Sequence, residues 1–267
     1  MEIAGYIAAI FIGISLGLIG SGGSILTVPV LVYLFGVDAV TATSYSLFIV
    51  GLTSAVGCVS YFKKGLVNLN IVALFGIPSI VSVVITRNII LPALPESMGQ
   101  VGGVLFSRSL ILLMLFAILM AGAAYGMIRN RNKIEPIPGE EDNLKTGLVV
   151  MNGFLIGLVT GLVGAGGGFL IIPALVMLLK VPMKSAIGNS LAIIAANSFI
   201  GFLSSHNHHA INWWLLLSIA ALAIAGIFIG MRISKNMDGS KLKPAFGWFV
   251  LVMALFIIVK ELAGHSA

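Results

Sequence analysis

The sequence predicts an all-α polytopic membrane protein built from two transmembrane repeats. Of its 267 residues, 59% are hydrophobic and only 9% are charged. Several apolar runs exceed the ~20 residues that a helix needs to cross the hydrocarbon core of a bilayer. The stretch 129–147 is charged and contains prolines, and it separates the apolar regions 1–128 and 148–267. We therefore expect two membrane repeats joined by a short exposed linker.

A glycine-rich motif occurs once in each half of the chain. The first copy runs from Gly17 to Pro29, and the second runs from Gly161 to Pro173, without a gap and 144 residues further on. The same offset aligns further identical pairs, which are Leu31 with Leu175, Ser46 with Ser190, Leu47 with Leu191, Ser54 with Ser198, Gly57 with Gly201 and Asn68 with Asn212. A chance similarity would not keep one constant offset over so many residues. The architecture therefore results from an internal duplication.

Each half contains four apolar segments, and the first of them is too long for one span. The segments are 3–35, 39–62, 69–91 and 103–128 in the first half and 148–180, 184–205, 211–233 and 241–262 in the second. A helix of roughly 32 residues would reach ~48 Å, against a hydrocarbon core of ~30 Å. The clustered glycines predict a break, since each costs about 1 kcal/mol relative to alanine in a helix. The broken segment is then either one tilted span or a re-entrant hairpin.

The distribution of basic residues favours the re-entrant hairpin. If every segment crosses once, seven basic residues lie on one side of the membrane and eight on the other. If both glycine-broken segments are re-entrant, twelve lie on one side, and only Arg87, Arg108 and Lys260 lie on the other. The second distribution agrees with the excess of basic residues in cytoplasmic loops. It places the linker in the cytoplasm and both termini outside, and it makes the halves inverted repeats, as in many transporters.

The two helix breaks are the predicted binding site for a small anion. A helix that restarts after a break presents free N–H groups and the positive end of its dipole. The candidate residues are Gly20, Ser21, Gly22, Gly23 and Ser24 at the first break, Gly164, Ala165, Gly166, Gly167 and Gly168 at the second, and Ser46, Asn189 and Ser190 on the helices that follow. The alternatives are close helix packing by the glycines and interhelical hydrogen bonds by the polar residues.

The other polar residues argue against a cation site or a metal site. All acidic residues fall in predicted loops or at segment ends, whereas a proton relay or cation site requires a carboxylate at mid-membrane. His206, His208 and His209 share a short loop but lack a fourth ligand, so no metal is expected. We expect Arg87 and Arg232, near the ends of matching segments, to anchor at the membrane interface.

The two motifs and the residues after them resemble the sulfite exporter TauE/SafE family, also called the TSUP transporters. These residues are Thr43-Ser44-Tyr45-Ser46-Leu47 and Gly188-Asn189-Ser190-Leu191. The resemblance covers essentially the whole chain. It implies a transporter of sulfur-containing anions such as sulfite, thiosulfate or sulfoacetate in a bacterial or archaeal cytoplasmic membrane. The first motif reads Ser-Gly-Gly-Ser where the family more often has an unbroken glycine run.

The expected partners are therefore a small anion and the lipid bilayer, without a cofactor, a metal or a nucleic acid. The inside-negative potential favours export of an anion by ~2.3 kcal/mol per charge per 100 mV. Other interpretations stay open: an anion channel lined by the same hairpins, a carrier of another small organic anion, a structural membrane subunit, or a sulfur-handling enzyme that uses Cys58, the single cysteine. The sequence also leaves a homo-oligomer open.

Overall fold

The chain folds into a bundle of helices with one short pair of strands. The computed structural model describes residues 2–20, 22–95, 97–101, 104–129, 146–164, 166–179, 181–205, 211–235, 247–248 and 251–260. The first half contains α1 (Glu2–Ile19), α2 (Gly22–Tyr33), α3 (Ala39–Lys63), α4 (Leu69–Ile85), the π-helical segment η1 (Thr86–Ile90), α5 (Leu91–Ala93), β1 (Ser97–Val101), β2 (Val104–Ser107) and α6 (Arg108–Arg129). The second contains α7 (Thr146–Val163), α8 (Gly168–Leu178), α9 (Met183–Leu203) and α10 (Trp213–Lys235). A further apolar helix covers Leu251–Lys260.

The predicted helical class is confirmed, with two local differences. Antiparallel strands β1 and β2 pair Val101 with Val104 across the dipeptide Gly102-Gly103, a composition that favours tight hairpin turns over helix. The helix α6 therefore begins at Arg108 and not at residue 103. The helix α7 begins at Thr146, just inside the predicted linker, most of which lies outside the described residues.

Five helices within the described residues are long and apolar enough to cross a membrane. They are Ala39–Lys63, Leu69–Ala93, Thr146–Val163, Met183–Leu203 and Trp213–Ser234. On α4 and η1, four isoleucine and valine side chains repeat every fourth residue and are between 36% and 64% exposed: Ile77, Val81, Ile85 and Ile89. A continuous exposed apolar stripe of this kind fits a face that contacts lipid.

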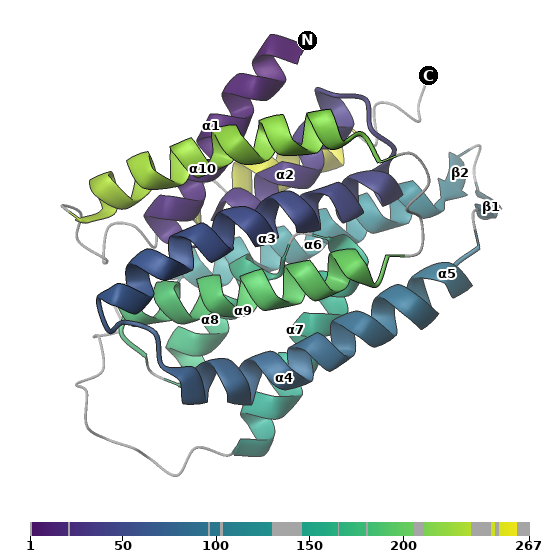
Figure 1. The fold of residues 1–267 in the computed structure, drawn as a ribbon. Helices are drawn as coiled ribbons and strands as arrows, with labels where there is room; N and C mark the ends of the chain where they lie inside the picture. Colours follow the sequence, from purple (N-terminus) through teal and green to yellow (C-terminus); the bar gives the residue numbers. More distant parts are fainter. Residues whose placement is uncertain are drawn as a thin grey trace.

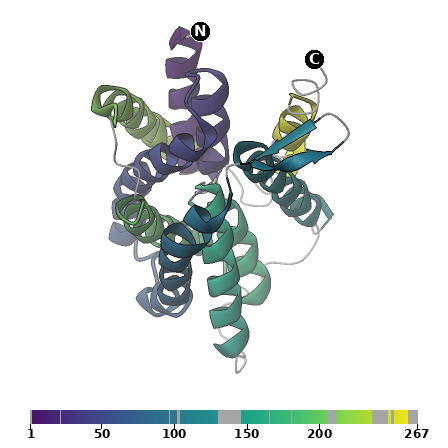
Figure 2. The ribbon, with the colours of Figure 1, turned by 90° about the vertical axis from the view of Figure 1, so that its right-hand side faces the viewer.

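The long first segment of each half breaks at its glycines and folds back on itself. At the first break, the ends of the segment meet, because the rings of Tyr6 and Phe35 pack edge to face with centroids 5.4 Å apart. In the second, Val149 near the start of α7 and Leu175 near the end of α8 share one hydrophobic cluster. Figure 2 shows the pair α1 and α2 at the top of the view and the pair α7 and α8 below it, with their broken ends near the centre.

The two halves pack on each other in a reciprocal way. The helix α1 packs on α10, and its counterpart α7 packs on α4, which is the counterpart of α10. Gly13 lies against the backbone of Ala223, and Gly157 lies against the backbone of Ser79. The two contacts are equivalent, because Gly157 follows Gly13 by 144 residues and Ala223 follows Ser79 by the same number. Small residues permit such close approach of helix backbones.

The helices α3 and α9 form the centre of the bundle, and they run in opposite directions (Figure 1). Gly51 on α3 lies against the side chain of Ser198 on α9. At the start of α3, the Asp38 carboxylate accepts hydrogen bonds from the backbone N–H groups of Val40 at 2.9 Å and Thr41 at 3.2 Å. This N-cap satisfies donors that have no acceptor within the helix and so fixes where α3 begins.

Candidate functional site

The first helix break lies at Gly20, as the sequence predicts. Gly20 has a φ of +77°, a left-handed conformation that glycine adopts without steric cost. Its N–H donates to the carbonyl of Leu16 at 2.7 Å and closes α1. The helix α2 begins at Gly22, and Gly23 packs directly on Ile12 and Leu16 of α1. Ser24 is completely buried, while Ser21 lies outside the described residues.

The second break is built from more glycines in unusual conformations. Gly164, Gly166 and Gly167 have φ values of 72°, 65° and 68°. Gly167 packs against the Thr160 side chain of α7, which brings the start of α8 at Gly168 back onto that helix. The N–H groups of Leu170 and Ile171 both donate to the carbonyl of Gly167 at 3.0 Å, so the N–H groups of Gly168 and Phe169 are the ones at this helix start that have no acceptor within the helix. Ala165 lies outside the described residues.

Each break lies against the central helix of the opposite half. Gly20 contacts Ile187 on α9, and Gly164 contacts Thr43 on α3. The two contacts are equivalent, because Gly164 follows Gly20 by 144 residues and Ile187 follows Thr43 by the same number. The Ser190 hydroxyl lies 3.4 Å from the carbonyl oxygen of Gly20 and 2.9 Å from that of Ile187. The structure therefore brings the predicted residues Gly20 and Ser190 together.

Several buried polar groups around the breaks have no hydrogen-bond partner within the described part of the chain. They include the hydroxyls of Ser46, Ser54 and Ser198 and the side-chain nitrogen of Asn189. The Ser198 hydroxyl lies next to Gly166 of the second break. Because buried polar groups are nearly always paired, these groups without described partners make α3 and α9 candidates for binding a polar ligand.

Asn189 and Asn197 also have roles in the fold. The side-chain oxygen of Asn189 accepts a hydrogen bond of 2.6 Å from the backbone N–H of Asn68. The side-chain nitrogen of Asn197 donates to the hydroxyl of Ser79 at 2.7 Å. Hydrogen bonding within the fold, the alternative to substrate binding, therefore accounts for one polar atom of each amide. The other atom, the nitrogen of Asn189 and the oxygen of Asn197, has no described partner.

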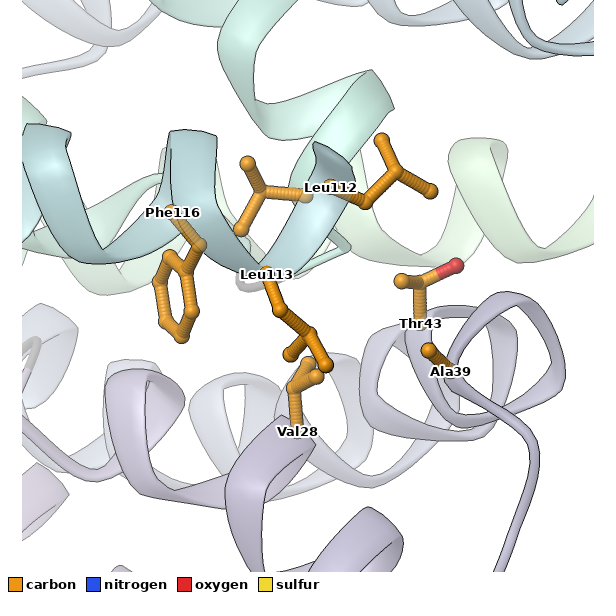
Figure 3. A pocket seen from close by; sticks show the side chains of 7 residues that line it. Val28, Ala39, Thr43, Leu112, Leu113 and Phe116 are labelled. Carbon is orange, nitrogen blue, oxygen red and sulfur yellow. The ribbon is translucent and has the colours of Figure 1, made fainter. Parts of the chain in front are cut away.

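All predicted site residues whose exposure the structure describes are buried. A small pocket lies beside them between α2, α3, α6 and α7 (Figure 3). Its lining residues are Val28, Ala39, Thr43, Leu112, Leu113, Phe116 and Val163. Thr43 is the one polar side chain among them, and its hydroxyl donates to the carbonyl of Val40 at 2.7 Å. An apolar pocket of this kind does not suit an anion.

Arg87 lies in a different environment from the one expected from the sequence. It does not anchor at the membrane interface, because its side chain is only 2% exposed, whereas Arg232 is exposed as expected. Arg87 lies in η1, and its neighbour Thr86 packs on Gly161 of α7. The available signal was its position: the apolar residues Ile89, Ile90 and Leu91 follow it, so it lies inside the span and not at its end.

Two other expectations stay without a structural answer. The three loop histidines, His206, His208 and His209, lie outside the described residues, and the described part of the chain holds no group of His, Cys, Asp and Glu that could bind a metal ion. Cys58 is half-buried on α3 beside an apolar cluster that includes Leu191.

Comparison with known proteins agrees with the geometry. The family model for the sulfite exporter TauE/SafE matches residues 6–257. A probable membrane transporter protein of Xylella fastidiosa (strain Temecula1) is 28% identical over 260 residues, which cover 96% of this chain and 94% of the relative. The probable membrane transporter protein YjnA of Bacillus subtilis is 22% identical over 260 residues, 97% of this chain and 100% of the relative.

A shorter match is to a probable membrane transporter protein of Methanocaldococcus jannaschii, 30% identical over 116 residues that cover 41% of this chain and 43% of the relative. No solved structure matches the chain. The family match spans both glycine breaks and all five candidate spans, and this family consists of membrane transporters, which implies transport without catalysis. The chain therefore belongs to the TauE/SafE sulfite exporter family of membrane transporters.

Proposed function

We propose that this transporter carries small sulfur-containing anions, such as sulfite, thiosulfate or sulfonates, across the cytoplasmic membrane, and that it binds them between the two glycine breaks. The observation that carries the proposal is the meeting of each break with the central helix of the opposite half. The two central helices carry buried hydroxyls and amides with spare hydrogen-bonding capacity, and one of them, the Ser198 hydroxyl, lies next to Gly166. Free backbone N–H groups at a helix start, such as that of α8, favour a negative charge.

The charges of the described residues also favour an anion. Asp38 is the one acidic residue whose side chain the structure describes, and it is exposed at the start of α3. The described carboxylate is thus exposed to its surroundings, whereas a cation site at the buried breaks would need a buried carboxylate. An inside-negative potential drives an anion outward, so we propose export as the direction.

The burial of the site supports a carrier over a channel. A channel lined by the hairpins requires a continuous open path, whereas the site residues Gly20, Ser46 and Gly164 are buried. Carriers with broken helices bind substrate at the middle of the membrane and expose it to each side in turn. Flux that saturates with concentration and that is stimulated by substrate on the opposite side would support a carrier; flux that rises linearly would favour a channel.

We also propose that the two glycine-broken segments are re-entrant and that the halves form an inverted pair, with the linker in the cytoplasm and the termini outside. The contact between Tyr6 and Phe35 supports a hairpin whose ends share one side. The opposite directions of α3 and α9 (Figure 1) support the inversion. The helix α7, which is long enough to span, is in this proposal one arm of the second hairpin.

The topology is tested by labelling single cysteines with a membrane-impermeant maleimide in a Cys58→Ala background. Glu2→Cys and Asp38→Cys are both labelled from outside if the first segment is re-entrant. Lys64→Cys, at the exposed end of α3, is labelled only after the membrane is opened. Labelling of Glu2→Cys and Asp38→Cys from opposite sides would show that the first segment spans the membrane.

The substrate is tested by flux into proteoliposomes that contain the purified protein, with labelled sulfite, thiosulfate, sulfoacetate and sulfate at imposed potentials of both signs. We expect saturable uptake of at least one sulfur anion that follows the potential. Asn189→Ala should weaken it, since the variant removes a buried donor that has no described partner. Asn152→Ala is the matched control, because Asn152 bonds only to Leu148 of its own helix among the described residues. Flux equal to that of empty liposomes for all four anions would overturn the substrate class.

A further inference from the structure

Arg87 is a buried cation in a segment that the proposed function does not yet use. Its side chain is one of the largest that the structure buries fully, at 2% exposure. Arginine stays protonated in proteins, and burying its charge is costly unless a counter-charge is present. Ionisable residues inside membrane segments usually mark a substrate or ion pathway. The π-helical turn of η1 that carries Arg87 is itself a feature that occurs often at functional sites.

The described neighbours of Arg87 accept hydrogen bonds from only one of its three guanidinium nitrogens. Its Nη1 donates to the hydroxyls of Ser44 at 3.2 Å and Ser205 at 3.4 Å. Its Nε and Nη2 are buried and have no hydrogen-bond partner among the residues that the structure describes. The two serines are neutral, so they supply no counter-charge. The Asp38 carboxylate is exposed and accepts hydrogen bonds from the backbone N–H groups of Val40 and Thr41 at the start of α3.

The two unpaired nitrogens are the pair that binds an oxyanion best. The N–H groups of Nε and Nη2 lie along one edge of the planar guanidinium and point the same way. This edge donates two parallel hydrogen bonds to two oxygens of a carboxylate, sulfonate or similar anion. Nη1, which faces away from this edge, is the nitrogen that the serines occupy. The described contacts thus hold the side chain in place and leave its binding edge unused.

Arg87 lies beside the second glycine break. Thr86, the residue before it, packs on Gly161, three residues before the break at Gly164. Ser44, its hydrogen-bond partner, follows Thr43, which packs on Gly164 itself. The start of α8 therefore offers uncharged backbone donors at this break, and η1 brings a positive charge to its flank.

We propose that Arg87 is the charged ligand of the transported anion. Its Nε–Nη2 edge makes the site selective for oxyanions, in which two oxygens can accept the two parallel N–H groups, over a monatomic anion such as chloride. This inference rests on the proposed anion transport. The equivalent residue of the other half is Met231, so the anion meets a full positive charge at the second break only.

The experiment measures the half-saturating concentrations of sulfite and chloride for the purified protein in gluconate buffer, from the anion-dependent rise in its melting temperature. The variants are Arg87→Met, which copies the other half, Arg87→Lys, which keeps the charge but loses the planar fork, and Arg232→Gln, the exposed control. For Arg87→Met we expect at least a ~30-fold rise in the half-saturating sulfite concentration, as for a lost charge-assisted pair of hydrogen bonds. Arg87→Lys should reduce the preference for sulfite over chloride about tenfold, and Arg232→Gln should match the wild type.

The outcomes separate this inference from the proposed function. Sulfite-dependent stabilisation of the wild type together with an unchanged value in Arg87→Met would overturn the role of Arg87 and leave anion transport standing. If Arg87→Met does not fold, Arg87→Lys decides, because a wild-type affinity and a wild-type preference for sulfite over chloride would show a merely structural arginine. A wild type that responds to neither anion and transports none would overturn both proposals.

Discussion

The two glycine breaks occupy equivalent positions in the duplicated chain, but they are built differently. At the first break, Gly20 takes a left-handed φ, and the Ser190 hydroxyl of the other half lies next to its carbonyl. At the second, Gly164, Gly166 and Gly167 all have left-handed φ values. A buried arginine flanks the second break, and Met231 occupies the equivalent place beside Gly17 in the other half.

This difference shows that the duplication keeps the contact of each break with the opposite central helix and lets the backbone conformation and the charge vary. The contacts of Gly20 with Ile187 and of Gly164 with Thr43 repeat in both halves, because both breaks need the same close approach to a central helix. A single positive charge offsets part of the charge of the proposed anions, and a second one would have to be buried at further cost. In the proposed site, an anion between the breaks would therefore meet two unequal surroundings, which a transporter with a preferred direction can use.

The largest effect that we predict comes from Gly164→Ala. Its left-handed φ of +72° costs a residue with a Cβ about 1–2 kcal/mol, and the Cβ would overlap Thr43, which adds about 1–3 kcal/mol. We expect a large fall in the melting temperature of the purified protein in detergent.

Gly36→Ala is the matched control for this prediction. Gly36 has nearly the same φ, +68°, but nothing lies within 4 Å of its would-be Cβ. Gly36→Ala should lower the stability only by the cost of the left-handed φ, about 1–2 kcal/mol. An equal fall in the two variants would mean that the contact between the break and Thr43 contributes nothing.

The reciprocal helix contacts should respond equally in both halves. Gly13→Ala and Gly157→Ala each place a Cβ onto a backbone carbonyl, of Ala223 and of Ser79. We expect each to destabilise the protein by about 1–3 kcal/mol, measured by thermal unfolding. Gly122→Ala on α6, where nothing lies within 4 Å, should be neutral or slightly stabilising. A loss confined to one half would show that the two interfaces are not equivalent.

The helix breaks were predictable from the sequence because their cause is local. Clustered glycines at Gly20 to Gly23 and Gly164 to Gly168 destabilise a helix wherever it lies, and the breaks at Gly20 and Gly164 are confirmed. The start of α6 was wrong by a few residues, because hydropathy alone does not distinguish the short strand Val104–Ser107 from the first turn of an apolar helix.

The burial of Arg87 and the sharing of hydrogen bonds could not be predicted, because both depend on packing between the halves. Hydropathy indicates the depth of Arg87 in its segment, but the face that carries it is buried only because η1 packs near α3, α7 and α9. Likewise, Ser46 and Ser190 are equivalent in sequence, yet only Ser190 has a described hydrogen bond.

A pair of equivalent loop contacts offers a smaller test. The side-chain oxygen of Asn189 accepts from the N–H of Asn68, and the hydroxyl of Tyr45 accepts from the N–H of Asn212 at 2.8 Å. Asn189→Ala and Tyr45→Phe should each lose about 0.5–1.5 kcal/mol of stability. Only Asn189→Ala should also weaken the stabilisation by sulfite, because Asn189 has a spare buried donor. A similar loss of sulfite response in Tyr45→Phe would instead assign both residues to the fold.

The smallest predicted effect separates the two equivalent serines. Ser190→Ala removes the hydrogen bond to the carbonyl of Ile187 and should cost about 0.5–1.5 kcal/mol without any anion. Ser46→Ala removes a buried hydroxyl with no described partner, so the anion-free protein should be unchanged or slightly more stable. If Ser46 donates a hydrogen bond to the anion, the effect of Ser46→Ala should appear only in sulfite. The melting temperature of this variant should then rise less on addition of sulfite than that of the wild type. An equal rise would remove Ser46 from the binding site, and its hydroxyl would then be a buried group that no ligand explains.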